Sequence, residues 1–164
     1  MKQLLLNKIA KREITVGVIG LGYVGLPLAV EKAKAGFRTI GFDEQAAKVD
    51  MVNEGHNYIG DVVDKDLKRL VDEGLLSATS DFAFIQDVDF IAICVPTPLD
   101  VHQEPDLSCV RDSTAEIAKH LKRNTMVVLE STTYPGTTEE LIRPILEEGS
   151  GLVCGQDFYL GFSP

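Results

Sequence analysis

Three glycines with the spacing G-x-G-x-x-G, namely Gly20, Gly22 and Gly25, are the residues whose types and spacing are most suggestive of chemistry. They follow the apolar run Val16–Ile19, and Asp43 stands eighteen residues beyond the last of them. The first glycine permits a tight turn, the second lets a pyrophosphate approach the backbone, and the third lets the next helix pack closely on the strand. An acidic residue at this spacing can bind ribose hydroxyls. The pattern predicts a dinucleotide site.

The main chain of Tyr23 and Val24 would form the entry of that helix, where unpaired N–H groups and the positive end of the helix dipole attract an anion. Three alternatives remain open. The glycines could form a turn in some other α/β protein, Asp43 could be the N-cap of the following helix, and the Tyr23 side chain could serve only in packing.

Two further segments follow apolar runs that are typical of buried strands. The run 88–95 ends at Val95 and is followed by Pro96 and Thr97. The run 126–129 is followed shortly by Ser131 and Thr132. Ligands of open parallel sheets bind at the carboxyl ends of the strands, so these segments are expected to meet the glycine turn. The alternatives are that the proline-rich segment merely ends a strand and that the two hydroxyls cap a turn.

The elements that must position these residues alternate between strand and helix along the chain. This alternation predicts an α/β fold, a Rossmann-like open parallel sheet with helices on both faces. A capping box at Thr137 and Glu140 is expected to start a helix that breaks near Pro144. We expect strands at 16–19, 38–43, 77–79, 88–95, 126–129 and 157–162, and helices at 26–35, 44–53, 64–73 and 107–121.

Composition narrows the function classes. With 164 residues, 45% of them hydrophobic, the chain is expected to form one domain over residues 14–164, which contains the predicted dinucleotide site and is preceded by an extension, residues 1–13, with a short helix. A net charge of −9 disfavours nucleic-acid and anionic membrane partners. Three irregularly spaced cysteines indicate reduced thiols and a cytoplasmic location. The histidines and cysteines lack ligand spacing, so no metal is expected.

Taken together, these segments make the chain similar to the NAD-binding domain of the UDP-glucose/GDP-mannose dehydrogenases, the nucleotide-sugar 6-dehydrogenase family. The string at 130–140 most resembles members that oxidise UDP-N-acetylglucosamine. The matching strings are Gly-Leu-Gly-Tyr-Val-Gly-Leu-Pro at 20–27, Gly-Phe-Asp at 41–43, Val-Pro-Thr-Pro at 95–98, Glu-Pro-Asp-Leu at 104–107, Glu-Ser-Thr-Thr-Tyr-Pro-Gly-Thr-Thr-Glu-Glu at 130–140 and Phe-Ser-Pro at 162–164.

The resemblance implies oxidation of the C6 alcohol of a sugar nucleotide to a carboxylate, with two NAD⁺ reduced. It implies that Lys48 joins Asp43 at the adenosine ribose, although Lys48 could equally be a solvated helix charge. It also implies that residues 95–97 and Ser131 line the nicotinamide half of the cofactor. Thr132 matches a family threonine beside the reaction centre, where a hydroxyl can position water or the substrate oxygen.

In the family, a cysteine of a second domain holds the aldehyde-level intermediate. The central linking helix, that cysteine and the sugar-nucleotide domain have no counterpart in these 164 residues, and none of Cys94, Cys109 and Cys154 stands in a matching context. We therefore expect the chain to bind NAD but to be inactive by itself, with a UDP-sugar as substrate only of a full-length enzyme and a homo-oligomer as a possible assembly. Two alternatives stay open: an NAD(H)-binding regulatory module without chemistry, and a hydroxyacid dehydrogenase of related fold.

Overall fold

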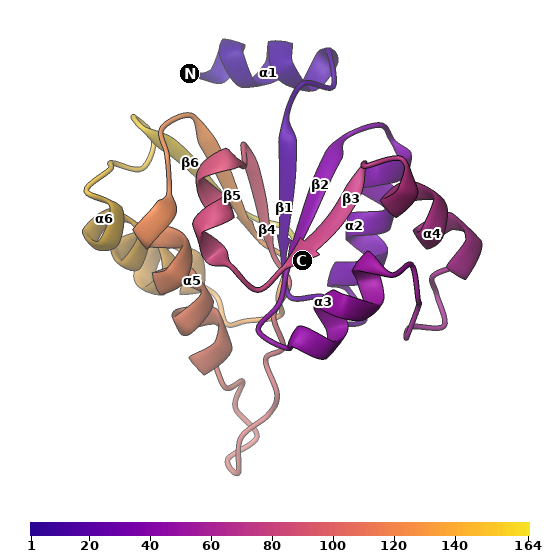
Figure 1. The fold of residues 1–164 in the computed structure, drawn as a ribbon. Helices are drawn as coiled ribbons and strands as arrows, with labels where there is room; N and C mark the ends of the chain where they lie inside the picture. Colours follow the sequence, from indigo (N-terminus) through magenta and orange to yellow (C-terminus); the bar gives the residue numbers. More distant parts are fainter.

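A computed structural model describes all residues, 1–164, and contains one six-stranded sheet in which every pair of neighbouring strands is parallel (Figure 1). The spatial order is β3-β2-β1-β4-β5-β6, which is the doubly wound order of dinucleotide-binding folds. The strands are β1 (Thr15–Ile19), β2 (Arg38–Phe42), β3 (Leu76–Thr79), β4 (Phe90–Ile93), β5 (Thr125–Leu129) and β6 (Phe158–Phe162). The predicted Rossmann-like parallel sheet is confirmed.

Helices cover both faces of the sheet, as predicted (Figure 1). Alternate residues of each strand face opposite sides, so the core consists of two separate apolar clusters. One cluster packs β1 and β3 against α2 (Gly25–Lys34), α3 (Ala46–Asn53) and α4 (Asp64–Asp72). The other packs the sheet against the 3₁₀ turn η1 (Phe82–Asp87), α5 (Ser108–His120), the π-helical turn η2 (Thr138–Ile142) and α6 (Arg143–Ser150).

The strand order reverses at β1, because the chain builds β2 on one side of it and β4 on the other. The loops after β1 and β4 therefore leave the same edge of the sheet in opposite directions and open a crevice between them. The register places the end of β1 next to the ends of both neighbours, with Ile19 opposite Phe42 and Ile93. The glycine turn thus begins at the mouth of this crevice.

A short helix, α1 (Lys2–Ala10), precedes β1 and lies across the amino edge of the sheet (Figure 1). Its anchor is Asp89, which is 6% exposed and receives hydrogen bonds from the Thr15 N–H, from Lys122 at 3.0 Å and from Lys8 at 3.3 Å. Burial by itself would raise the pKa of Asp89, but this N–H and the two ammonium groups hold it below its ordinary value. The anchor lies at the opposite edge from the glycine turn.

Two local predictions need correction. The strand expected at 88–95 is shorter, because η1 and its C-cap reach Val88 and the Asp89 side chain is engaged with β1. The capping box at Thr137 does not form: its hydroxyl donates to the Tyr134 carbonyl instead, and the chain enters a π-helical turn. The helix does change character at Pro144, which stands in the first turn of α6.

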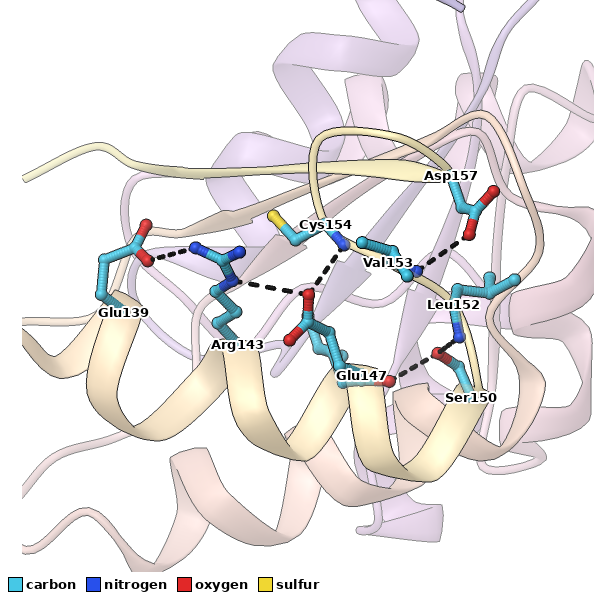
Figure 2. A network of polar contacts seen from close by, with 9 residues as sticks. Glu139, Arg143, Glu147, Ser150, Leu152, Val153, Cys154 and Asp157 are labelled. Atoms are coloured by element: carbon cyan, nitrogen blue, oxygen red, sulfur yellow. Dashed lines mark hydrogen bonds and ion pairs between the residues drawn. The ribbon is translucent and has the colours of Figure 1, made fainter.

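The connection from α6 to β6 is fixed by a polar network (Figure 2). Arg143 lies between Glu139 and Glu147, at 2.9 and 3.5 Å, and Glu147 also accepts the main-chain N–H of Cys154 at 2.9 Å. In the same loop, the Asp157 carboxylate accepts the Val153 N–H. These contacts set the position of the edge strand β6. No helix of the structure is both long enough and apolar enough to cross a membrane.

Candidate functional site

The three glycines of the turn have different surroundings, and each position differs in whether the protein leaves room for a side chain. Gly20 has φ +92°, and a Cβ there would lie 2.9 Å from the Cys94 carbonyl oxygen. A Cβ on Gly25 would lie 1.6 Å from the Gly20 carbonyl oxygen, so only glycine lets α2 pack against the turn. A Cβ on Gly22 would meet no atom within 4 Å. Protein packing therefore does not require glycine at Gly22, and the open space there suits a ligand.

The entry of α2 leaves main-chain donors free. The N–H groups of residues 22–25 have no acceptor within the protein, and no side chain caps the helix. The side chains of Tyr23 and Val24 are 83% and 58% exposed, so neither is used in packing within this chain. Free N–H groups at a helix entry, next to a position without a side chain, form a cradle that suits a diphosphate.

Leu21 fixes the turn through hydrogen bonds of both its N–H and its carbonyl group. Its N–H donates to Asp43 Oδ2 at 2.9 Å, and its carbonyl accepts the Tyr58 hydroxyl at 2.6 Å. Its side chain is fully buried and packs over Gly41 of β2, where a Cβ would lie 2.6 Å away. The turn is thus preorganised, with its backbone held in one arrangement before any ligand binds.

Asp43 therefore has a structural role as well as a position at the cleft. Gln45, and not Asp43, occupies the N-cap position of α3, so the alternative that Asp43 is the N-cap is wrong. Asp43 Oδ1 instead accepts the Gln45 N–H at 2.9 Å, just before the helix. Each Asp43 carboxylate oxygen accepts one hydrogen bond here and can accept a second, which leaves capacity for ribose hydroxyls. Burial and the Asp43 charge raise the pKa of Tyr58 to about 12, so this phenol remains a donor at neutral pH.

Two hydroxyls join the ends of β4 and β5. Ser131 is buried and donates to the Val95 carbonyl at 2.7 Å, while Thr97 donates to the Thr132 carbonyl at the same distance. Ser131 and Thr97 thus use their protons to hold the two segments together. The Thr132 side chain is exposed to the cleft, and its hydroxyl makes no hydrogen bond in the protein. Of these residues, Thr132 has the hydroxyl that is free to meet a ligand.

Lys48 lies in the first turn of α3 and is partly exposed at the cleft. A cation near a helix N-terminus is electrostatically unfavourable, and Lys48 takes part in none of the ion pairs of the structure. A charge that is unfavourable in its local structure and has no partner in the chain is often found at a functional site. The position favours the ligand-binding interpretation of Lys48 over that of a solvated helix charge.

The predicted residues meet in one open cleft of about 550 Å³ at the carboxyl edge of the sheet. All of them except Gly25, which packs beneath the turn, line this cleft: Gly20, Gly22, Tyr23, Val24, Asp43, Lys48, Val95, Pro96, Thr97, Ser131 and Thr132. The proline-rich segment thus ends a strand and lines the cleft. Leu21 and Glu130 also line the cleft and belong to the strand-exit segments expected there, 20–25 and 130–132. Sequence reasoning missed Tyr58, Ile59 and Cys94, which complete the lining.

Two of the three thiols are poorly suited to nucleophilic attack: Cys94, which lines the cleft, and Cys154, which lies in the loop before β6. Burial and the Glu130 carboxylate raise the pKa of Cys94 to about 12, and burial raises that of Cys154 as well. A thiol must ionise to act as a nucleophile, so a raised pKa disfavours nucleophilic attack by either of them. Cys109 is exposed but lies on α5, outside the lining of this cleft.

Comparison with known proteins agrees with this geometry. The sequence model of the UDP-glucose/GDP-mannose dehydrogenase family, NAD binding domain, matches residues 14–164. The chain belongs to this family. The cofactor of such a domain is NAD, and the free amides and the open space at Gly22 fit its diphosphate. Membership of this family excludes the alternative that the chain comes from a hydroxyacid dehydrogenase.

Similar proteins include Protein CapL and several proteins that carry names of nucleotide-sugar dehydrogenases. The chain is 41% identical to Protein CapL of Staphylococcus aureus over 91% of its length, and 40% identical to a UDP-N-acetyl-D-glucosamine 6-dehydrogenase of Pseudomonas aeruginosa over 93%. It superposes on a GDP-mannose dehydrogenase of Pseudomonas aeruginosa with a TM-score of 0.85 and 32% identity, covering 91% of this chain and 35% of that structure. The matched region is 34% and 35% of the length of the first two relatives, so the chain spans about a third of these proteins.

Proposed function

We propose that the chain is the cofactor-binding part of a nucleotide-sugar 6-dehydrogenase that oxidises the C6 alcohol of a UDP-hexose or UDP-N-acetylhexosamine to the carboxylate. The observation that carries the proposal is the preorganised turn, whose free N–H groups surround the open space at Gly22. The cleft would hold NAD⁺ as hydride acceptor, and two hydride transfers to two NAD⁺ molecules, with one water added and three protons released, would convert the alcohol to the carboxylate. The similarity to a UDP-N-acetyl-D-glucosamine 6-dehydrogenase supports an N-acetylhexosamine as the sugar.

In this proposal the residues of the cleft bind and orient the cofactor. The amides of residues 22–25 hold the diphosphate, and Asp43 with Lys48 holds the adenosine ribose. The segments from Val95 to Thr97 and at Ser131, joined by their hydroxyls, support the nicotinamide half. The unpartnered Thr132 hydroxyl then faces the position where a substrate oxygen or water would stand.

We also propose that the isolated chain is not a catalyst. The second oxidation in this family needs a thiolate to hold the aldehyde-level intermediate, and burial raises the pKa of the Cys94 and Cys154 thiols, which disfavours their ionised form. The sugar nucleotide, in turn, would bind to a domain that these residues do not form. The function of the chain by itself is therefore to bind the cofactor.

Calorimetry and an activity assay test both parts. The purified chain should bind NAD⁺ with a measurable affinity and bind NADP⁺ at least about tenfold more weakly, because a 2′-phosphate would meet the Asp43 carboxylate. Incubation with NAD⁺ and UDP-N-acetylglucosamine or UDP-glucose should produce no NADH absorbance. Absence of NAD⁺ binding would refute the first part, and formation of NADH would refute the second.

A further inference from the structure

The cofactor cleft extends to both sides of the glycine turn. Asp43 follows β2 and Lys48 lies in the first turn of α3, whereas Glu130 lines the cleft at the end of β5. Because the strands are ordered β2-β1-β4-β5, Asp43 and Glu130 lie on opposite sides of the turn that follows β1. A dinucleotide with its diphosphate at the turn and its adenosine ribose at Asp43 must therefore extend its nicotinamide towards the ends of β4 and β5.

Glu130 is the only charged side chain that lines this nicotinamide half. Of all the residues that line the cleft, three carry a charge at neutral pH, and the other two, Asp43 and Lys48, belong to the adenosine half. Glu130 is partly buried and takes part in none of the ion pairs of the structure. Its negative charge is therefore not compensated by any cation of the chain.

The pairing of β4 with β5 fixes the position of Glu130. Ile93 lies opposite Leu129, and the Glu130 N–H donates to the Ile93 carbonyl at 2.9 Å. The next residue of β4's exit, Cys94, also lines the cleft. Burial and then the Glu130 carboxylate raise the pKa of Cys94 to about 12, so the charge of Glu130 acts on groups within the cleft.

The oxidised and reduced forms of NAD differ by one charge, and that charge lies on the nicotinamide ring. The ring of NAD⁺ is a cation, and acceptance of a hydride makes it neutral. A fixed carboxylate in the nicotinamide half attracts the cationic ring and has no such attraction for the neutral one. Charge placed near the reactive ring is one of the means by which a protein tunes a redox cofactor.

We infer that Glu130 makes this domain discriminate between the two redox states of its cofactor, because its carboxylate strengthens the binding of NAD⁺ relative to that of NADH. The inference rests on the proposed cofactor function and extends it to cofactor exchange. Oxidation of an alcohol to a carboxylate uses two NAD⁺, so in a site that holds one cofactor at a time NADH must leave and a second NAD⁺ must bind between the two steps. Weaker binding of NADH favours this exchange.

Calorimetric titration with NAD⁺ and with NADH tests the inference on the wild type, Glu130→Gln, Glu130→Lys and the control Glu148→Gln. Glutamine keeps the size of Glu130 and an oxygen acceptor, and removes only the charge. Glu148 is exposed, forms no ion pair and does not line the cleft, so its variant makes the same change in net charge elsewhere.

The quantity to compare is the Kd of NADH divided by the Kd of NAD⁺. Relative to the wild type, this ratio should fall by about fivefold or more in Glu130→Gln and by roughly 25-fold or more in Glu130→Lys, where the change in charge is twice as large. Glu148→Gln should keep the wild-type ratio. Both ligands are titrated into the same preparation, so partial unfolding of a variant would weaken both equally and leave the ratio unchanged.

Asp43→Asn separates an effect on the ring from a general loss of affinity. Asp43 lines the adenosine half, which is identical in NAD⁺ and NADH. This variant should therefore weaken both ligands by the same factor and keep the ratio within about twofold of the wild type. A fall in the ratio as large as that of Glu130→Gln would show that the discrimination does not come from the end of β5, and would overturn the inference.

The inference and the proposed function fail in distinguishable ways. If the wild type binds both ligands and the two Glu130 variants keep its ratio, the inference is overturned and the cofactor function stands. If Glu148→Gln lowers the ratio as much as Glu130→Gln, the discrimination comes from net charge, and again only the inference is overturned. If the wild type binds neither NAD⁺ nor NADH, the proposed function fails and the inference fails with it.

Discussion

Replacing Gly22 and Gly25 separately by alanine should separate ligand binding from folding. The two glycines belong to one turn, but a Cβ at Gly22 meets no atom within 4 Å, whereas a Cβ at Gly25 would lie 1.6 Å from the Gly20 carbonyl oxygen. Contacts under 3.0 Å essentially never occur for a real Cβ, so in Gly25→Ala the turn and α2 must separate until 1.6 Å becomes at least 3.0 Å. The Cβ is fixed by the main chain of residue 25 and the oxygen that it meets belongs to the main chain of Gly20, so no flexible side chain can move aside.

The expected magnitudes differ accordingly. Gly25→Ala should lower the free energy of unfolding by about 3 kcal/mol or more, as forced core distortions do, and lower the melting temperature by roughly 6–12 °C for a chain of this size. Gly22→Ala should change the free energy of unfolding by less than about 1 kcal/mol, since its backbone conformation suits alanine. Its methyl group would stand where the diphosphate approaches, so NAD⁺ should bind at least about tenfold more weakly, or about 1.4 kcal/mol.

Thermal unfolding and calorimetric titration with NAD⁺ measure the two effects on the same samples. Gly60→Ala is the matched control, because a Cβ there also meets no atom within 4 Å and the residue does not line the cleft. The control should match the wild type in both measurements. If Gly22→Ala bound NAD⁺ as tightly as the wild type, the diphosphate would not lie over the turn and the reasoning would be wrong.

Three further predictions follow from contacts at the turn and at the opposite edge. Asp43→Ala should weaken NAD⁺ binding by about tenfold or more and narrow the preference over NADP⁺; an unchanged NAD⁺/NADP⁺ ratio in calorimetry would contradict the ribose role. Tyr58→Phe removes the 2.6 Å hydrogen bond to Leu21 and should lower the free energy of unfolding by roughly 1 kcal/mol, measured by urea unfolding. In the wild type, the Tyr58 phenol should titrate spectroscopically near its raised pKa of about 12. A phenolate signal near pH 10 that is absent from Tyr58→Phe would contradict the burial of this phenol. The pKa of Asp89 is lowered by folding, so its stabilisation is present above the ordinary carboxyl pKa and is lost as pH falls through the lowered value; Asp89→Asn should therefore lose roughly 1–3 kcal/mol at pH 7 and progressively less in acid, whereas a pH-independent loss would exclude the ionic anchor.

The fold could be predicted from the sequence because its signals are local. The apolar run before Gly20 and the alternation of strand and helix determine the parallel sheet, and the structure has strands and helices near the expected positions. The boundaries shifted where a tertiary contact competes with the local pattern. Asp89 belongs to the apolar run of β4, yet its side chain bonds to the start of β1. Thr137 fits a capping box, yet its hydroxyl finds the Tyr134 carbonyl first.

The site was predictable only where strand exits supply the residues. The ends of β1, β4 and β5 converge by topology, which is why residues far apart in sequence line one cleft. Tyr58 lies in the loop after α3, and no spacing rule connects it with Leu21, so its contact with the turn could not be foreseen. The structural duties of Ser131 and Thr97 were also hidden, because which way a hydroxyl donates depends on the carbonyls that the fold brings near it.

Determining a crystal structure of the chain with NAD⁺ bound is the most direct test of the central claim. Density for the diphosphate is expected within hydrogen-bond distance of the N–H groups of residues 22–25, next to Gly22, with the adenosine ribose hydroxyls at the Asp43 carboxylate. A dinucleotide bound at another edge of the sheet, or a turn whose amides stay unengaged at saturating NAD⁺, would contradict it.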